Sequence, residues 1–135
     1  MKFDRRLTDE IYTSDTVRLG KNAFQAMRET IYHNGGVGTI AGYYDAELSI
    51  LSVSDLLLHN LSHSYASLME QTKGSLKNLF YKKDAAFLDN ARFRQLQGEG
   101  EGRILTADGS PVYVRLYKKD AVDTDGTPIW ILSVQ

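Results

Sequence analysis

The hydrophobic and polar positions in the last third of the chain alternate with a period of two, which is typical of β-strands. Within residues 112–117 the even-numbered positions are apolar and the odd-numbered positions are tyrosine or arginine. Residues 103–107 and 129–134 are also strand-like, and an Asp-Gly pair separates each segment from the next. Such pairs favour hairpin turns, so the pattern predicts three consecutive antiparallel strands. The apolar face of their sheet must be covered by residues from upstream.

Two further strands are predicted at residues 37–44 and 48–53, joined by a short link. Small residues at Gly38, Ala41 and Gly42 leave space beside one face of the first of them. Glycine weakens a strand, and its presence usually marks a bulge or a close approach by backbone or ligand.

From residue 54 to about residue 97 the apolar spacing becomes that of several short helices. The residues able to cap them are Ser54 or Asp55, Ser64 and Asp84. The order of two strands, several helices and three strands predicts an α+β fold, because the strands come in sequential antiparallel groups.

The first 34 residues predict a helix in two pieces, with a break near Gly20 and Asn22 as a possible N-cap of the second piece. Phe24, Met27 and Ile31 share one side of that piece. Apolar spacing leaves two interpretations open. The helix either lies on the sheet of its own domain or serves as a dimerising helix that carries a signal.

Composition narrows the possible functions. A chain of 135 residues is long enough for one domain with its own core. Its 16 basic and 17 acidic residues give a net charge of −1, which argues against a nucleic-acid partner. No segment approaches the roughly 20 apolar residues of a membrane span, and the first residues are too polar for a signal peptide. The absence of cysteine is compatible with the cytoplasm, which is the location we predict.

No set of residues predicts catalysis or metal binding. His59 and His63 are four residues apart, but no nearby cysteine or carboxylate would complete a metal site. The GEGEG segment at residues 98–102 precedes a strand instead of opening a helix, and its glutamates would repel phosphate. It is interpreted as a flexible connector. We therefore expect a protein that is not an enzyme.

Residues 37–135 resemble a PAS domain of the sensory-box type found in bacterial signalling proteins. The segments that carry the resemblance are GTIAGYYD at 38–45, Ser54-Asp55 before a leucine-rich helix, GSLKNLFYKKD at 74–84, ADGSPVYVRLY at 107–117 and DTDGTPIWILSV at 123–134. The resemblance implies a five-stranded antiparallel sheet of order 2-1-5-4-3, with short helices around a small cavity on one face. Residues 1–36 would then be an N-terminal helical extension of a PAS domain at 37–135.

The resemblance also implies a function. The chain would be a sensory or regulatory module that binds a small molecule or relays a conformational signal to an attached effector. That effector would be a histidine kinase of a two-component system, a diguanylate cyclase of the GGDEF type or a transcription factor. The alternative is a PAS module without a ligand that only dimerises or binds other proteins.

Candidate site residues follow from the implied fold. The expected ligand-binding residues are Ile40, Gly42, Tyr44, Leu57, Leu61, Leu79, Phe87, Ala91, Val114, Ile131 and Ser133. The expected homodimer interface comprises Phe24, Met27 and Ile31 of the helix, with Tyr113, Tyr117 and Trp130 on the sheet face opposite the cavity.

The resemblance leaves the cofactor unassigned. Without cysteine, the flavin adduct of light-sensing members cannot form. Haem-binding members place a histidine on the long helix, and residues 84–97 contain none. The glutamates that often follow the capping serine in the family are replaced by Ala66 and Ser67, which predicts an incomplete capping box after Ser64.

Overall fold

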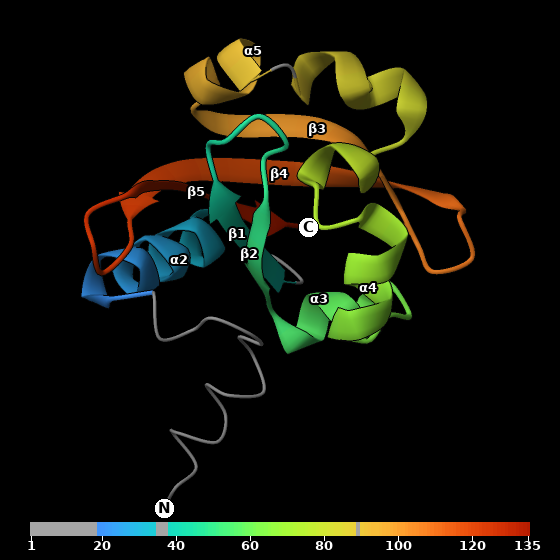
Figure 1. The fold of residues 1–135 in the computed structure, drawn as a ribbon, viewed down its shortest axis with the longest axis horizontal. Helices are drawn as coiled ribbons and strands as arrows, with labels where there is room; N and C mark the ends of the chain where they lie inside the picture. The colour runs from blue at the N-terminus through green and yellow to red at the C-terminus, as the bar shows by residue number, and fades with distance from the viewer. Residues whose placement is uncertain (1–18, 35–37, 89) are drawn as a thin grey trace, which may run out of the picture.

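A computed structural model describes residues 19–34, 38–88 and 90–135. Its centre is a five-stranded antiparallel sheet of order β2-β1-β5-β4-β3 (Figure 1), which confirms the predicted order. The strands are β1 (Gly38–Tyr43), β2 (Ile50–Val53), β3 (Gly98–Leu105), β4 (Pro111–Val122) and β5 (Pro128–Val134). The last strand of the chain is therefore the central one, paired with β1 on one side and with β4 on the other.

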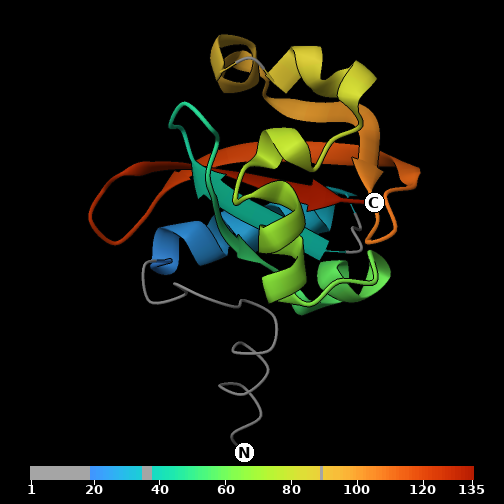
Figure 2. The same cartoon turned by 45° about the vertical axis from the view of Figure 1, so that its right-hand side comes forward.

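Among the described residues, five short helices lie between β2 and β3. They are α3 (Asp55–Asn60), α4 (Tyr65–Thr72), the 3-10 helices η2 (Leu76–Asn78) and η3 (Lys82–Leu88), and α5 (Asn90–Gln95). Figures 1 and 2 show α3 and α4 next to each other and α5 next to β3, and in Figure 2 α4 lies in front of the sheet. The N-terminal helix α2 (Lys21–Asn34) lies instead along β4 and β5.

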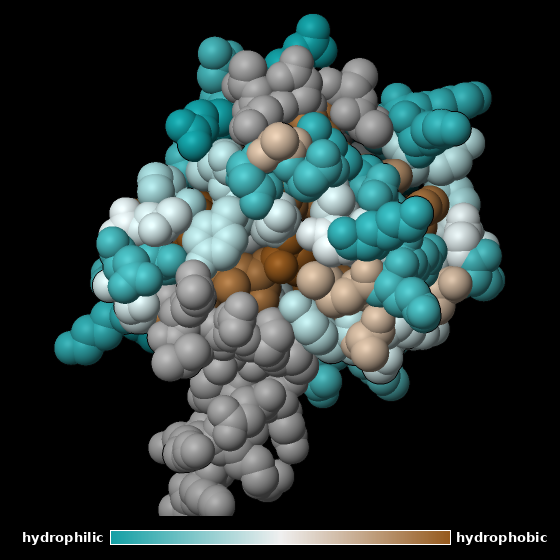
Figure 3. All heavy atoms as spheres, in the orientation of Figure 1, coloured by the Kyte–Doolittle hydropathy of each residue, from teal (hydrophilic) through white to brown (hydrophobic). Residues whose placement is uncertain are grey.

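The sheet separates two hydrophobic clusters. The larger, on what we call the inner face, joins alternate residues of the strands, such as Trp130 and Leu132 of β5, to the short helices. The smaller, on the outer face, joins the intervening residues Ile129 and Ile131 to Met27 and its neighbours on α2. Helix α2 therefore packs on the sheet of its own domain, the first of the two interpretations. Figure 3 shows hydrophobic residues in a hollow near the centre of one view, surrounded largely by hydrophilic ones.

Aspartate side chains stabilise both predicted hairpins. Asp108 accepts hydrogen bonds from the backbone N–H of Ser110 and from the Thr106 hydroxyl, and Gly109 next to it has a φ of 85°. Asp123 accepts two backbone N–H groups in the β4–β5 turn through Oδ1. Its other oxygen accepts the Tyr43 hydroxyl at 3.0 Å, so this buried aspartate also fastens the turn to the end of β1.

Ser54 and Ser64 are N-caps, as predicted, but two details of the predicted capping were wrong. Ser67 bonds back to the Ser64 backbone, so the capping box that we expected to be incomplete is present. The hydroxyl of a serine at this position does the work of the usual glutamate. Asp84 lies within η3 and binds Arg103 on β3, where it accepts the backbone N–H at 2.8 Å and two guanidinium bonds.

Two further expectations from the sequence were wrong. Asn22 is inside α2 and not its N-cap, and its side chain accepts the backbone N–H of Val122 at 2.9 Å. Residues 98–102 are not a connector but the first half of β3, paired with β4 in regular register. Alternating glutamates point away from the core there, so a glycine-rich segment can still form a strand whose partner supplies the side-chain packing.

The glycines of β1 mark close approaches within the protein. A Cβ atom on Gly42 would lie 2.1 Å from the Ser49 carbonyl oxygen and 2.3 Å from the indole of Trp130. One on Gly38 would lie 2.5 Å from Cβ of Leu57 on α3. The space that these small residues leave is therefore occupied by the protein's own backbone and side chains.

Within the described residues, no helix is both long and apolar enough to cross a membrane. The same part of the chain contains no group of three or more histidine or acidic side chains placed to hold a metal ion. His59 lies in the last turn of α3, whereas His63 lies beyond Ser62, whose φ is 62°. The Nδ1 atom of His63 pairs with the Ser67 hydroxyl at 2.7 Å. The two histidines are thus not on one helix face.

Candidate functional site: a buried lysine cluster

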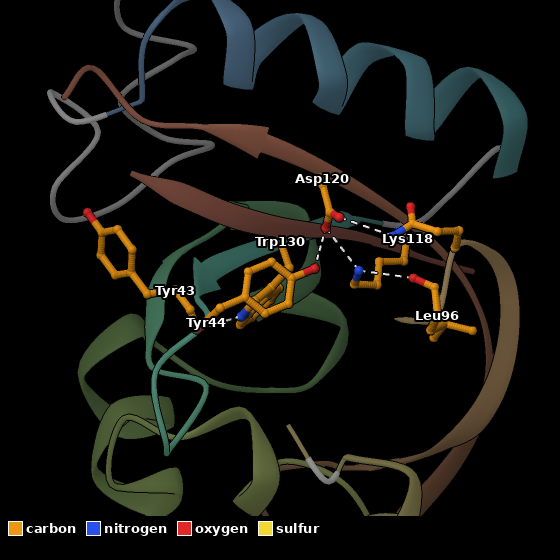
Figure 4. Close-up of polar contacts among 7 residues, drawn as sticks. Tyr43, Tyr44, Leu96, Lys118, Asp120 and Trp130 are labelled. Atoms are coloured by element: carbon orange, nitrogen blue, oxygen red, sulfur yellow. Dashed lines mark hydrogen bonds and ion pairs between the residues drawn. The ribbon is translucent and has the colours of Figure 1, made fainter. Parts of the chain in front are cut away.

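Charged and polar side chains meet on the inner face of the sheet, where β1, β4 and the end of α5 come together (Figure 4). We call this group the lysine cluster. Its members are Tyr44, Leu96, Gln97, Lys118 and Asp120. Lys118 is the only lysine or arginine that is buried among the residues described, and the sequence did not identify this cluster.

Lys118 is the centre of the cluster, and its side chain has no exposed surface. The ammonium group donates to the Leu96 carbonyl at 3.0 Å and to Asp120 Oδ1 at 2.9 Å. It also lies 5.1 Å from the ring centroid of Tyr44 and 5.2 Å from that of Phe93. Burial lowers the pKa of Lys118, and Asp120 only partly offsets this effect. The cation is thus held by one carboxylate, one carbonyl and two aromatic rings.

Asp120 connects the cluster to three elements. Its carboxylate accepts the Tyr44 hydroxyl, the Lys118 ammonium and the Gln97 amide, the last at 3.0 Å. Burial acts to raise the pKa of Asp120, but these hydrogen bonds outweigh it and the net shift is downward. Burial and the bond to Asp120 together raise the pKa of the Tyr44 phenol, so Tyr44 is a neutral donor.

The lowered pKa of Asp120 makes stability depend on pH in acid. A carboxylate whose pKa is lower in the folded state stabilises the protein above its unfolded pKa of about 4, and this contribution disappears as the pH falls through the folded value. We expect the unfolding free energy of Asp120→Asn to fall less than that of the unmodified protein between about pH 5 and pH 2. Urea titrations at a series of pH values measure this; parallel pH profiles would contradict the assignment.

A groove opens beside the cluster. It has a volume of about 290 Å³ and is lined by Tyr43, Tyr44, Asp45, Arg94, Thr127 and Pro128. The Arg94 guanidinium lies 4.6 Å from the centroid of the Tyr44 ring, so that ring contacts a second cation besides Lys118. This contact links the exposed side of α5 to the end of β1.

Trp130 completes the inner face next to the cluster. It is fully buried, its ring meets Phe93 edge to face at a centroid distance of 5.6 Å, and its Nε1 donates to the Tyr43 carbonyl at 2.9 Å. Because its indole occupies the space beside Gly42, the side chain takes the place that the sequence left for a ligand.

The predicted ligand-binding residues divide between the two faces. Five of them, Ile40, Leu57, Leu61, Leu79 and Val114, are buried in the inner cluster, and Tyr44 packs against it. Ile131 and Ser133 were placed wrongly. They face α2, where the Ser133 hydroxyl donates to the Thr30 carbonyl at 3.2 Å. The side chains of Phe87 and Ala91 lie outside the described part of the structure.

The predicted dimer interface also needs correction. Trp130 is on the inner face, not the outer one, and Met27 is buried against its own sheet. Phe24 is half-buried in the same outer cluster. Tyr113 is 61% exposed and Tyr117 half-buried on the outer side of β4, as expected. The side chain of Ile31 falls outside the described residues. Whether any of these residues meets a second copy stays a prediction.

A signal for Lys118 was present in the sequence. The alternation that places Val112, Val114 and Leu116 on one side of β4 continues to Lys118 and Asp120. Charged residues normally lie in solvent, so alternation alone does not predict that a lysine at this position is buried. The partners of the two residues, which come from β1 and from the end of α5, could not have been read from local sequence.

Solved structures with similar folds include the following two. A PAS domain of an HTR-like protein from Haloarcula marismortui aligns with a TM-score of 0.58 at 15% identity, covering 83% of this chain and 96% of that one. The photo-excited blue-light photoreceptor Vivid aligns with a TM-score of 0.52 at 13% identity, covering 73% of this chain and 77% of its own. No family model and no curated protein matches the sequence. The strand order, the short helices on the inner face and these two likenesses together show that the chain has the PAS fold.

Proposed function

We propose that this chain is a sensory or regulatory module that relays a conformational change from the inner face of its sheet to helix α2. One observation carries the proposal: successive residues of β4 hold different elements. Lys118 and Asp120 hold the end of α5 on the inner face, whereas Lys119 and Ala121 contact α2 on the outer face. Figure 4 shows α2 on one side of these strands and the cluster on the other.

Specific polar contacts fix α2 at both of its ends. Lys119 forms an ion pair with Glu29 at 2.5 Å. Near the start of the helix Asn22 accepts the backbone N–H of Val122, and near its end the Thr30 carbonyl accepts the Ser133 hydroxyl. A change in the twist of β4 therefore also changes how α2 packs against its outer face, because successive side chains of a strand point to opposite faces.

The mechanism is a shift between two populations. A state in which the lysine cluster is intact holds α5 against the sheet, and a state in which it is broken frees α5 and the neighbouring part of β4. A ligand, a partner or an attached domain that favours one state changes the other site by the same coupling free energy.

The resemblance to sensory-box PAS domains supports a more specific proposal. We infer an effector joined to this chain, either a histidine kinase, a GGDEF diguanylate cyclase or a transcription factor. The same proposal includes a homodimer, a small-molecule ligand and a cytoplasmic location. It also divides the chain into an extension at 1–36 and a domain at 37–135.

Hydrogen exchange tests the relay. Lys118→Met removes both bonds of the ammonium group without altering a residue that faces α2. We expect the amides of α2 to exchange about fivefold faster than in the unmodified protein, which corresponds to a coupling of about 1 kcal/mol.

Val114→Ala is the matched control, since Val114 is buried on the same face of β4 but pairs with Gly102 at the far end of the strand. It should accelerate exchange in the sheet without a specific effect on α2. Exchange confined to α5 in Lys118→Met, with α2 behaving as in the control, would disprove the relay.

A module without a ligand is the second candidate, and the position of Trp130 beside Gly42 favours it. Native mass spectrometry of the purified chain distinguishes the two. A bound small molecule that is released on denaturation supports a ligand sensor. A chain without a bound molecule, in which Lys118→Met still accelerates exchange in α2, supports a relay driven by contacts between proteins.

A further inference from the structure

We propose that the open edge of β3 at residues 98–102 binds an extended, basic segment of a partner protein, which pairs with β3 as an added strand. Strand addition of this kind takes its affinity from main-chain hydrogen bonds and its specificity from alternate side chains. This edge is independent of the relay, which runs between the two faces of β4.

The direction of the backbone groups follows from Arg103. Its carbonyl accepts the Tyr81 N–H at 2.8 Å and its own N–H donates to Asp84, so both groups point away from β4. In an antiparallel pair this direction repeats at every second residue. The backbone groups of Glu101 and Glu99 therefore also point to the edge. In agreement, Arg115 opposite Glu101 exchanges hydrogen bonds with Gln135 on the other side of β4.

Residues 79–81 of the chain itself pair with this edge of β3 from Leu105 to Arg103 and do not continue beyond Arg103. Leu79 accepts the N–H of Leu105 at 2.9 Å, and Phe80 forms a bridge with Ile104. At Arg103 the segment turns into η3, and the Asp84 carboxylate takes the place of the next strand residue. Within the described residues, no further backbone hydrogen bond reaches this side of Glu99 and Glu101. Two donors and two acceptors remain in strand register.

The charge on this edge selects the partner. Glu99 and Glu101 are exposed and lie on the outer face, opposite Tyr117 and Arg115 of β4. A groove of about 450 Å³ adjoins the edge, lined by Asp84, Glu101, Gly102, Arg103 and Tyr113. In an added strand, the residues opposite the glutamates would face the same side, where lysine or arginine forms favourable cross-strand pairs. A second copy would place glutamates against glutamates, so self-pairing is disfavoured.

Two synthetic peptides test the proposal. One alternates lysine and valine over seven residues, and the other alternates glutamate and valine. We expect the lysine peptide to shift the amide resonances of Glu99 and Glu101 and to slow their hydrogen exchange. It should bind at least about fivefold more tightly than the glutamate peptide, because two opposite-charge pairs replace two like-charge pairs. The double variant Glu99→Lys, Glu101→Lys should reverse the preference, because it leaves the backbone edge intact.

Glu101→Pro removes one edge donor without removing a bond to β4, and should weaken the lysine peptide by about tenfold. If that variant fails to fold, the double variant Glu99→Lys, Glu101→Lys still tests the proposal. The proposal is overturned if both peptides bind equally or if the amide resonances that shift lie outside residues 98–102. It is also overturned if the amides of Glu99 and Glu101 become protected from exchange at high protein concentration without peptide, because a second copy would then occupy the edge.

Discussion

Trp130→Ala is expected to lower the free energy of unfolding by about 4 kcal/mol, because a fully buried tryptophan is replaced by a cavity that its neighbours can fill only in part. The variant also loses the edge-to-face contact with Phe93 and leaves the Tyr43 carbonyl without its indole donor. The space beside Gly42 cannot close easily, since the Ser49 carbonyl already limits the approach of the two strands.

Urea unfolding followed by circular dichroism measures this loss; fluorescence would not serve, because Trp130 is the chain's only tryptophan. Trp130→Phe separates the two contributions. It keeps a ring in place but removes the hydrogen bond, and should cost about 1 to 2 kcal/mol. Tyr113→Ala on the exposed outer face is the control and should change stability by less than about 0.5 kcal/mol. A loss below about 2 kcal/mol for Trp130→Ala would contradict tight packing at this position.

Lys118→Ala is expected to cost about 3 kcal/mol, whereas Lys118→Met should cost less than about 1 kcal/mol. The alanine variant removes the buried aliphatic stem and leaves a cavity against Phe93. The methionine variant keeps most of the stem and removes a buried charge, and Asp120 retains its bonds to Tyr44 and Gln97. Since Asp120 is 44% exposed, water can replace the lost ammonium group there.

The same unfolding experiment applied to both variants tests whether packing or charge matters more at residue 118. Equal losses for alanine and methionine would show that the ion pair, not the stem, stabilises the fold. A matched comparison at Lys119, whose side chain is 44% exposed in its pair with Glu29, should show only a small difference between alanine and methionine.

The positions of the strands could be predicted because turn chemistry and alternation mark most of them clearly, whereas their order in the sheet was implied by the resemblance to PAS domains. On β4 the outer residues are polar, so the faces of Val114 and Leu116 were assigned correctly. β5 offers no such contrast. Its residues are buried on both faces, by the short helices on one side and by α2 on the other. Apolar residues on both faces of β5 hide which side is which, and Trp130, Ile131 and Ser133 were therefore assigned to the wrong faces.

The lysine cluster could not be predicted for a different reason. Its partners are far apart in sequence: Tyr44 directly follows β1, Gln97 follows α5, and Asp120 lies 76 residues after Tyr44. Only the packing of α5 on the sheet brings them together. The glycines of β1 gave a correct indication of close approach, but the approaching groups proved to be Trp130 and the Ser49 carbonyl and not a ligand.

Helix α2 runs in the same direction as β5, since its first turn bonds to Val122 beside the β4–β5 turn and Thr30 bonds to Ser133 near the end of the strand. A tension applied between the start of the helix and the end of the strand would therefore load these attachments in shear, all at once, instead of peeling them apart one by one. In such a geometry the rate of rupture depends on the barrier to sliding the whole helix along the sheet.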